Sequence, residues 1–211
     1  MLRGLALTFA LSLAPPAMAA WHHEDVHWGK LHCPSDNTST LPTPTYGSEG
    51  SVWMICTEMI IDAPPRAIYD ALLDFRSYHL WNSFVVDVEL PENVTRTPDD
   101  VYVGMPMFFT VAGLLPDANT TSDEILTVLD DQSSEKYLMN AWRSNTFLNG
   151  TLSQAEHPNI LTSAEFGRTR YVSYETYYDG PNNPLLFPLK GQLQAEFDQQ
   201  GLDLKRYVEA L

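Results

Sequence analysis

The chain has 211 residues, of which 44% are hydrophobic and 18% are charged, and its formal net charge at pH 7 is −15. This length is enough for one domain with a sizeable core. Because an acidic surface repels the phosphates of nucleic acids and of anionic membranes, the composition argues against nucleic acid as a partner.

The first residues predict a secretory leader. Arg3 supplies a positive flank, residues 5–13 form a short apolar run, and residues 17–19 read Ala-Met-Ala, a cleavage signal. The run is too short to span a bilayer, and no later segment offers the roughly 20 apolar residues that a span needs. We therefore expect a secreted protein without membrane insertion. The expected parts are a signal peptide at 1–19, a polar Pro-rich extension at 20–50 and a folded domain at 51–211.

Four Asn-x-Ser/Thr triplets accompany this leader. One triplet often occurs by chance, but four in an exported chain predict N-glycosylation. Glycans require exposed backbone, and the second and third triplets lie in stretches that resemble loops. The expected glycosylation sites are Asn37, Asn93, Asn119 and Asn149.

Cys33 and Cys56 are the only cysteines. In an oxidising compartment two cysteines most simply pair with each other, although free thiols and an intermolecular bond are alternatives. Neither cysteine has the basic surroundings that activate a catalytic thiol. We predict a disulfide that holds the segment 34–50 against the first strand.

Histidines are concentrated near the start of the mature chain, at His22, His23, His27 and His32. A histidine at the third mature position could chelate Cu(II) with the terminal amine and two amides. However, short histidine-bearing ends are often simply solvated, and no second cluster of Cys, His or carboxylate completes a site. The sequence therefore predicts no metal and no cofactor.

The elements follow one another in an order typical of an α+β domain. Residues 52–61 are rich in β-branched and apolar side chains, which predicts a strand. A proline pair then opens a helix in which Ile68, Leu72 and Phe75 recur at helical spacing. Further strands, which would form a curved antiparallel sheet, are expected at 84–90, 105–112, 124–129, 137–143, 152–161 and 170–178.

The last segment predicts a long helix. From Leu186 to Leu211, apolar residues recur every three or four positions, and polar residues cover the other side. Gly201 weakens the middle of this helix and would allow a bend. Such a helix needs an apolar partner surface, and the concave face of the sheet is the one available.

Several stretches resemble the START, Bet v 1 and polyketide cyclase (SRPBCC) superfamily. The first helices of that superfamily combine a proline pair, an aliphatic and aromatic helix, an Asp-Phe turn and Trp-Asn, and residues 63–85 read APPRAIYDALLDFRSYHLWNSFV. The later stretches YLMNAWRS, AEHPNIL, GRTRYVSYETYYDG and LKGQLQAEFDQQGLDLKRYVEAL resemble the rest in order and spacing. Ser83 departs from the proline that many relatives have after Trp-Asn.

The resemblance covers residues 52–211 and implies a helix-grip fold, a curved antiparallel β-sheet wrapped around a long C-terminal helix with two short helices after the first strand. It also implies a hydrophobic small molecule as ligand or substrate, as in secreted fungal polyketide cyclase/dehydrase-like proteins. A cyclase, isomerase or dehydratase of polyketide or terpenoid biosynthesis is the first expectation. A non-catalytic extracellular carrier of a lipid, sterol or pigment is the alternative, and fold alone does not choose between them.

Residue types indicate which side chains would line the cavity. Met105, Met107 and Phe109 share one side of a strand and offer an adaptable apolar wall. Asn140 and Trp142 share a face of another strand and add an amide and an indole donor. The alternative is that all of them pack a solid core. The full expected lining is Phe84, Met105, Met107, Phe109, Asn140, Trp142, Leu189, Leu193 and Phe197.

Cyclisation or dehydration needs a base that removes a proton next to a carbonyl and a donor that stabilises the enolate. His157 with Tyr174 or Arg143 could fill these roles, although a histidine before a proline is more often a turn residue. Glu175 is a further candidate, and strand alternation sends it and Tyr174 to opposite faces. The sequence leaves open which face of 170–178 lines the cavity, the ligand's identity and the oligomeric state.

Overall fold

The computed structural model describes residues 26–131 and 137–211. Its main element is a seven-stranded antiparallel sheet in the order β1-β7-β6-β5-β4-β3-β2. The first two strands in the chain are therefore the two edges of the sheet. The strands are β1 (Ser51–Ile61), β2 (Val85–Glu89), β3 (Pro106–Leu115), β4 (Ala118–Asp130), β5 (Tyr137–Ser144), β6 (Ala155–Ser163) and β7 (Thr169–Tyr178).

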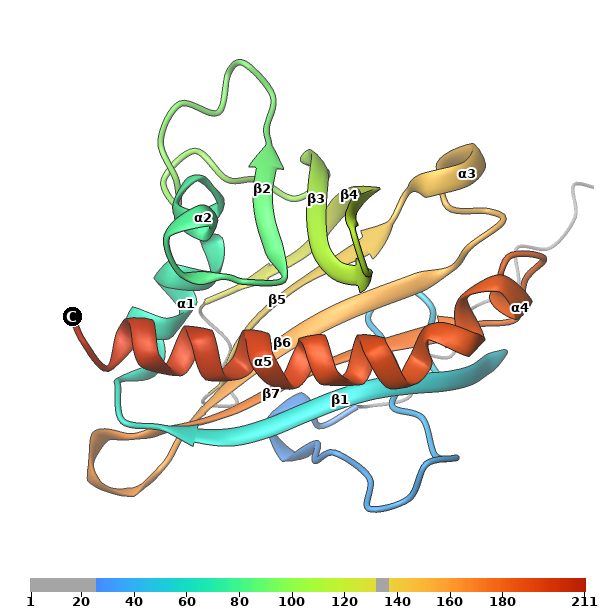
Figure 1. Ribbon diagram of the computed structural model, residues 1–211. Helices are drawn as coiled ribbons and strands as arrows, with labels where there is room; N and C mark the ends of the chain where they lie inside the picture. The colour runs from blue at the N-terminus through green and yellow to red at the C-terminus, as the bar shows by residue number, and fades with distance from the viewer. Residues whose placement is uncertain (1–25, 132–136) are drawn as a thin grey trace, which may run out of the picture.

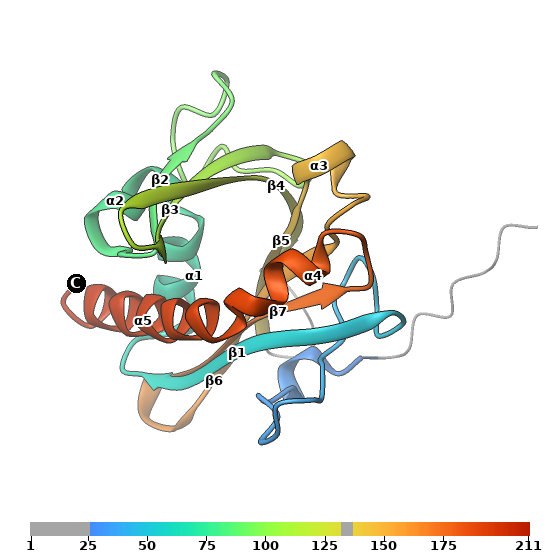
Figure 2. The ribbon, with the colours of Figure 1, turned by 45° about the vertical axis from the view of Figure 1, so that its right-hand side comes forward.

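One long helix lies across the concave side of this sheet, and two short helices follow the first strand (Figure 1). A view turned by 45° shows the sheet curling around the long helix (Figure 2). The predicted helix-grip fold is thus confirmed. The helices are α1 (Pro65–Leu73), α2 (Tyr78–Trp81), α3 (Thr146–Asn149), α4 (Asn183–Leu186) and α5 (Lys190–Val208), with 3₁₀ turns at Trp28–Lys30, Phe75–Ser77, Glu165–Gly167 and Phe187–Leu189.

The terminal helix begins later than its apolar periodicity predicts. Pro184 and Pro188 lie at the starts of α4 and of the following 3₁₀ turn, because a proline cannot donate the backbone hydrogen bond that a continuing helix requires. The α5 helix then runs unbroken through Gly201. A Cβ atom at Gly201 would lie 2.6 Å from the terminal carbon of Met59. Glycine here therefore permits close contact with β1.

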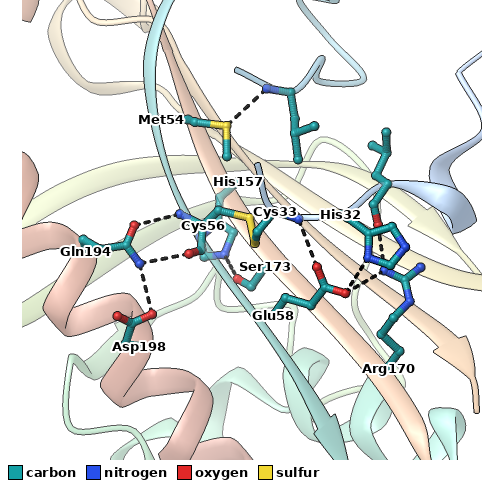
Figure 3. Close-up of a disulfide and its surroundings, with 12 residues drawn as sticks. His32, Cys33, Met54, Cys56, Glu58, His157, Arg170, Ser173, Gln194 and Asp198 are labelled. Atoms are coloured by element: carbon teal, nitrogen blue, oxygen red, sulfur yellow. Dashed lines mark hydrogen bonds and ion pairs between the residues drawn. A yellow bond between two sulfur atoms is a disulfide. The ribbon is translucent and has the colours of Figure 1, made fainter. Parts of the chain in front are cut away.

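The helix also binds the backbone of the edge strand. Gln194 donates from Nε2 to the carbonyl of Cys56 at 2.9 Å and accepts from its N–H at 3.0 Å (Figure 3). Edge strands have unpaired backbone groups. The Gln194 side chain bonds the N–H and C=O of Cys56, which a neighbouring strand would otherwise bond. The main core lies between α5, α1 and the concave face, where Leu193, Phe197 and Leu204 are buried.

The segment 26–50 covers the opposite, outer face of the sheet. Trp28, Leu31 and Leu41 pack against a second core cluster of Met54, Tyr137, Met139, Ile160, Val172 and Tyr174. Arg170 donates to the carbonyls of Gly29 at 2.7 Å and Leu31 at 2.6 Å, and its guanidinium lies 3.3 Å from Glu58. The predicted disulfide is present, joining Cys33 to Cys56 (Figure 3).

All four asparagines of the Asn-x-Ser/Thr triplets are exposed. Asn119 is not in a loop, however, but at the start of β4, because the chain turns tightly at Pro116–Asp117 and residues 118–125 pair with β3. The predicted signal peptide, His22 and His23 lie outside the described residues. Within the described part of the chain, no helix is both long and apolar enough to cross a membrane.

Removal of the disulfide should destabilise the fold. The bond closes a loop with a sequence separation of 23 residues, and chain-entropy arguments assign roughly 3 kcal/mol to a loop of this size. We expect the double variant Cys33→Ser/Cys56→Ser to lose about that much free energy of unfolding in urea titrations. Wild-type protein unfolded under reducing conditions is the matched control, and an unchanged midpoint in both would contradict the assignment.

Candidate functional site

A cavity of about 330 Å³ lies between α5 and the concave face of the sheet. Its size is within the range of roughly 300–1,000 Å³ that small-molecule sites usually occupy. Side chains of β3 to β7 form its floor, and α4 and α5 contribute leucines from above. The wall is mostly apolar, and its aromatic members are Phe84, Phe109, Trp142, Tyr177 and Phe197.

Two carboxyl groups lie in this apolar cavity. Glu124 comes from β4 and Glu175 from β7, and both line the same space. Burial raises the pKa of Glu124 to about 8, and the charge of Glu175 adds to the effect. Burial raises the pKa of Glu175 to about 7, while a hydrogen bond from Tyr177 opposes the shift. Each group can therefore hold its proton near neutral pH.

Alternation along β7 explains how these groups meet. Tyr171, Ser173, Glu175 and Tyr177 point to the concave face, whereas Tyr174 points to the outer face. The Tyr177 hydroxyl donates to Oε2 of Glu175 at 2.8 Å. This bond orients the carboxyl group and leaves its other oxygen for a ligand.

His157, on β6, also lines the cavity. Its Nε2 is 2.7 Å from Oγ of Ser173, and its ring packs between Trp142 and Phe197 at centroid distances of 4.5 and 4.6 Å. Burial lowers the pKa of His157 to about 3. The imidazole is therefore neutral at physiological pH and is a hydrogen-bonding group rather than a strong base.

The structure divides the predicted lining residues into two groups. Met105 and Met107 are buried in the packed core, and Asn140 accepts a hydrogen bond from Nδ2 of Asn159 at 3.1 Å. These three are not among the residues that line the cavity. Near Asn140, α1 packs against β5 and β6. The predicted residues that do line it are Phe84, Phe109, Trp142, Leu189, Leu193 and Phe197.

The four predicted catalytic residues do not come together. His157 and Glu175 line the cavity, and His157 lies within β6 rather than in a turn. Tyr174 is on the outer face, where its hydroxyl donates to the carbonyl of Pro42 at 2.6 Å. Arg143 alternates to the same outer face and donates to the carbonyl of Ser144 at 3.3 Å. Both were therefore wrong as cavity groups.

Sequence reasoning missed Glu124 and Gln200. Glu124 lies two residues before the buried Leu126 of β4, so the period of a strand places both on one face. Gln200 lies between Phe197 and Leu204 at the three-or-four spacing of the buried stripe of α5. In each case the sequence places a polar residue at a position that strand or helix periodicity assigns to the buried face, and this pattern could have identified both residues.

Across residues 26–131 and 137–211, no group of three or more His, Cys, Asp and Glu side chains is placed to hold a metal ion. One histidine of the predicted N-terminal cluster, His32, contacts the first strand: its Nδ1 lies 2.7 Å from a carboxylate oxygen of Glu58 (Figure 3).

Solved structures with this architecture are numerous, although no family model matches the chain and no curated protein matches it. A hypothetical protein from Helicobacter pylori shares 12% identity over 96% of this chain and 99% of its own, with a TM-score of 0.56. A norcoclaurine synthase from Thalictrum flavum, solved with a transition-state analogue, shares 12% over 76% and 96%, with a TM-score of 0.52.

The Zhui aromatase/cyclase from Streptomyces sp. R1128 shares 13% identity over 74% of this chain and 93% of its own, with a TM-score of 0.51. At such identities the likeness concerns the fold, and the chemistry must be argued from the site. The curled antiparallel sheet, the long C-terminal helix and these likenesses together show that the protein has the helix-grip fold.

Proposed function

We propose that the protein binds a hydrophobic small molecule in this cavity and catalyses proton transfer on it. Cyclisation, isomerisation and dehydration of a polyketide or terpenoid intermediate are reactions of this kind. The observation that carries the proposal is the placement of Glu124 and Glu175 in one apolar cavity. Two structural neighbours are enzymes by name, an aromatase/cyclase and a norcoclaurine synthase, which supports a catalytic use of the fold.

The two carboxyl groups are suited to opposite roles. Near neutral pH the more strongly shifted Glu124 keeps its proton and can donate it to a carbonyl or to a departing hydroxyl. Glu175, with a pKa of about 7, is present in both forms and can remove a proton next to a carbonyl. Because the two charges interact, their protons are lost in coupled steps.

We assign His157 a supporting role. Its low pKa makes it a weak base, and its hydrogen bond with Ser173 holds the ring in place. A neutral imidazole so held can stabilise an enolate oxygen by donating a hydrogen bond. Tyr177 supports Glu175 in a similar way.

Simple carriage of a lipid, sterol or pigment is the second candidate. Leu114, Leu186 and Leu189 make much of the wall apolar, and hydroxyl side chains such as those of Thr121 and Ser153 also line the cavity. Ligand capture from a culture extract followed by mass spectrometry separates the two. Recovery of one unmodified compound favours a carrier, whereas conversion of a captured compound that depends on Glu175 favours an enzyme.

A secreted, glycosylated protein is part of the proposal, supported by the leader-like start, the exposed triplets and the disulfide. Expression in a eukaryotic secretory host should give a product whose mass falls on treatment with a peptide N-glycosidase. The variant Asn149→Gln, altered at an exposed position of α3, should lose one glycan increment. A product with no enzyme-sensitive mass would contradict this part.

Filling the cavity should block ligand binding. Ala155 is buried at the start of β6 and lines the cavity, so the larger side chain of Ala155→Leu would project into it. We expect the affinity for the fluorescent apolar probe N-phenylnaphthylamine to fall roughly tenfold, measured by fluorescence titration. Ala195→Leu, on the exposed face of α5, is the matched control and should bind the probe as the wild type does.

Stability should fall as the pH rises through neutrality. The folded protein keeps protons on Glu124 and Glu175 that the unfolded chain, with an ordinary Glu pKa of 4.5, has already lost. The folded state therefore binds more protons than the unfolded chain at pH values between the unfolded pKa of 4.5 and the folded pKa values of about 7 and about 8. The free energy of unfolding consequently decreases from about pH 5.5 to about pH 8.5. His157 acts in the opposite direction, since its lowered pKa removes stability as the pH falls below 6.5.

Glu124→Gln should reduce this pH-dependent loss of unfolding free energy by on the order of 2 kcal/mol. Urea titrations at about pH 5.5 and about pH 8.5 measure the loss in each protein. His157 is present in both proteins, so its contribution cancels in the comparison. Asp87→Asn, at an exposed position of β2, is the matched control, because Asp87 is not among the charges that shift the pKa of Glu124. Equal pH slopes in wild type and Glu124→Gln would show that the carboxyl group is not held neutral.

A further inference from the structure

The cavity lining includes acidic side chains but no basic Lys or Arg among the described residues. Its acidic members are Glu124 on β4 and Glu175 on β7. Arg143 on the outer face of β5 lowers the pKa of Glu124 only weakly, because burial and Glu175 dominate. The imidazole of His157 on β6 faces the same space without a charge.

Gln200 is the second observation that points to a ligand. It comes from α5, is only 3% exposed and lines the cavity. Neither Nε2 nor Oε1 of this side chain has a hydrogen-bond partner in the protein. A buried amide without any partner is rare, because each unpaired polar atom loses its bonds to water on folding.

An amide at this position offers one donor group and one acceptor. Leu193 and Phe197 precede Gln200 on the same stripe of the helix, so it is a single polar group in an apolar surface. The glutamates reach the cavity from the sheet, whereas Gln200 reaches it from the helix. A polar head group between helix and sheet could bond to both sides.

Building on the proposed function, we infer that the ligand is an apolar molecule with a hydrogen-bonding head group that carries no negative charge, an alcohol, phenol or amine. Gln200 binds that head group, and the two glutamates determine which charge the cavity accepts. A hydroxyl can donate to Oε1 of Gln200 and accept from its Nε2, and an ammonium can pair with Glu175 in its ionised form. A carboxylate or phosphate would instead find no lysine or arginine among the described lining residues, and it would meet the charge of Glu175 in its ionised form in a medium of low dielectric constant.

A matched series of naphthalenes tests the charge preference. Naphthol, naphthylmethylamine and naphthoic acid, all substituted at the same ring carbon, compete with N-phenylnaphthylamine at neutral pH. We expect the alcohol and the amine to displace the probe at concentrations roughly tenfold lower than the acid. The double variant Glu124→Gln/Glu175→Gln should narrow the gap between amine and acid.

A second arm tests Gln200 itself. Gln200→Leu should weaken naphthol binding by roughly tenfold and leave methylnaphthalene, which has the same ring and no polar head, unchanged. Gln199→Leu is the control, since Gln199 lies one position along α5, bonds to Asp203 and is not among the lining residues. Thermal melting of each variant establishes that it is folded.

The outcomes separate this inference from the proposed function. If wild-type protein binds N-phenylnaphthylamine and naphthoic acid competes within about threefold of naphthol, the charge preference is overturned and the binding function stands. If Gln200→Leu weakens naphthol and methylnaphthalene equally, the role of Gln200 is overturned. If the probe does not bind the wild type at all, both proposals fall.

Discussion

The burial of one face of α5 against the concave side of the sheet is the interaction on which the rest depends. Leu193, Phe197 and Leu204 form the buried stripe, and Gly201 allows the backbone to approach Met59 of β1. A helix with such a stripe is not stable alone in water. The curl of the sheet and the position of the helix therefore stabilise each other, and the space left between them is the cavity.

The sheet uses its two faces differently. On the outer face, polar groups find partners within the chain: Glu156 accepts from the backbone and hydroxyl of Thr45 at 2.7 Å, and Arg170 holds the carbonyls of the N-terminal segment. On the concave face, Gln200 has no partner and two glutamates share an apolar space. A satisfied polar group contributes to the fold, whereas an unsatisfied one in a cavity indicates a ligand.

The chemistry of the site is a matter of environment more than of residue type. A glutamate in water is ionised at neutral pH, but burial lets Glu124 and Glu175 keep a proton there. The same burial removes the charge from His157, the residue type most often used as a base. Since the structural neighbours share only 12–13% identity with the chain, these local effects carry the functional argument.

The sequence by itself determined the order of the main elements, because strand alternation and helical spacing are local patterns. Its two cysteines indicated the disulfide, and the resemblance of residues 52–211 to a known superfamily implied the helix-grip fold. The sequence also indicated an aromatic wall including Phe109 and Trp142. Only the tertiary structure decided where along the concave face the cavity opens. A period tells which face a side chain occupies but not which element covers it. The α1 helix packs against β5, which carries Asn140, and the N-terminal segment covers Tyr174.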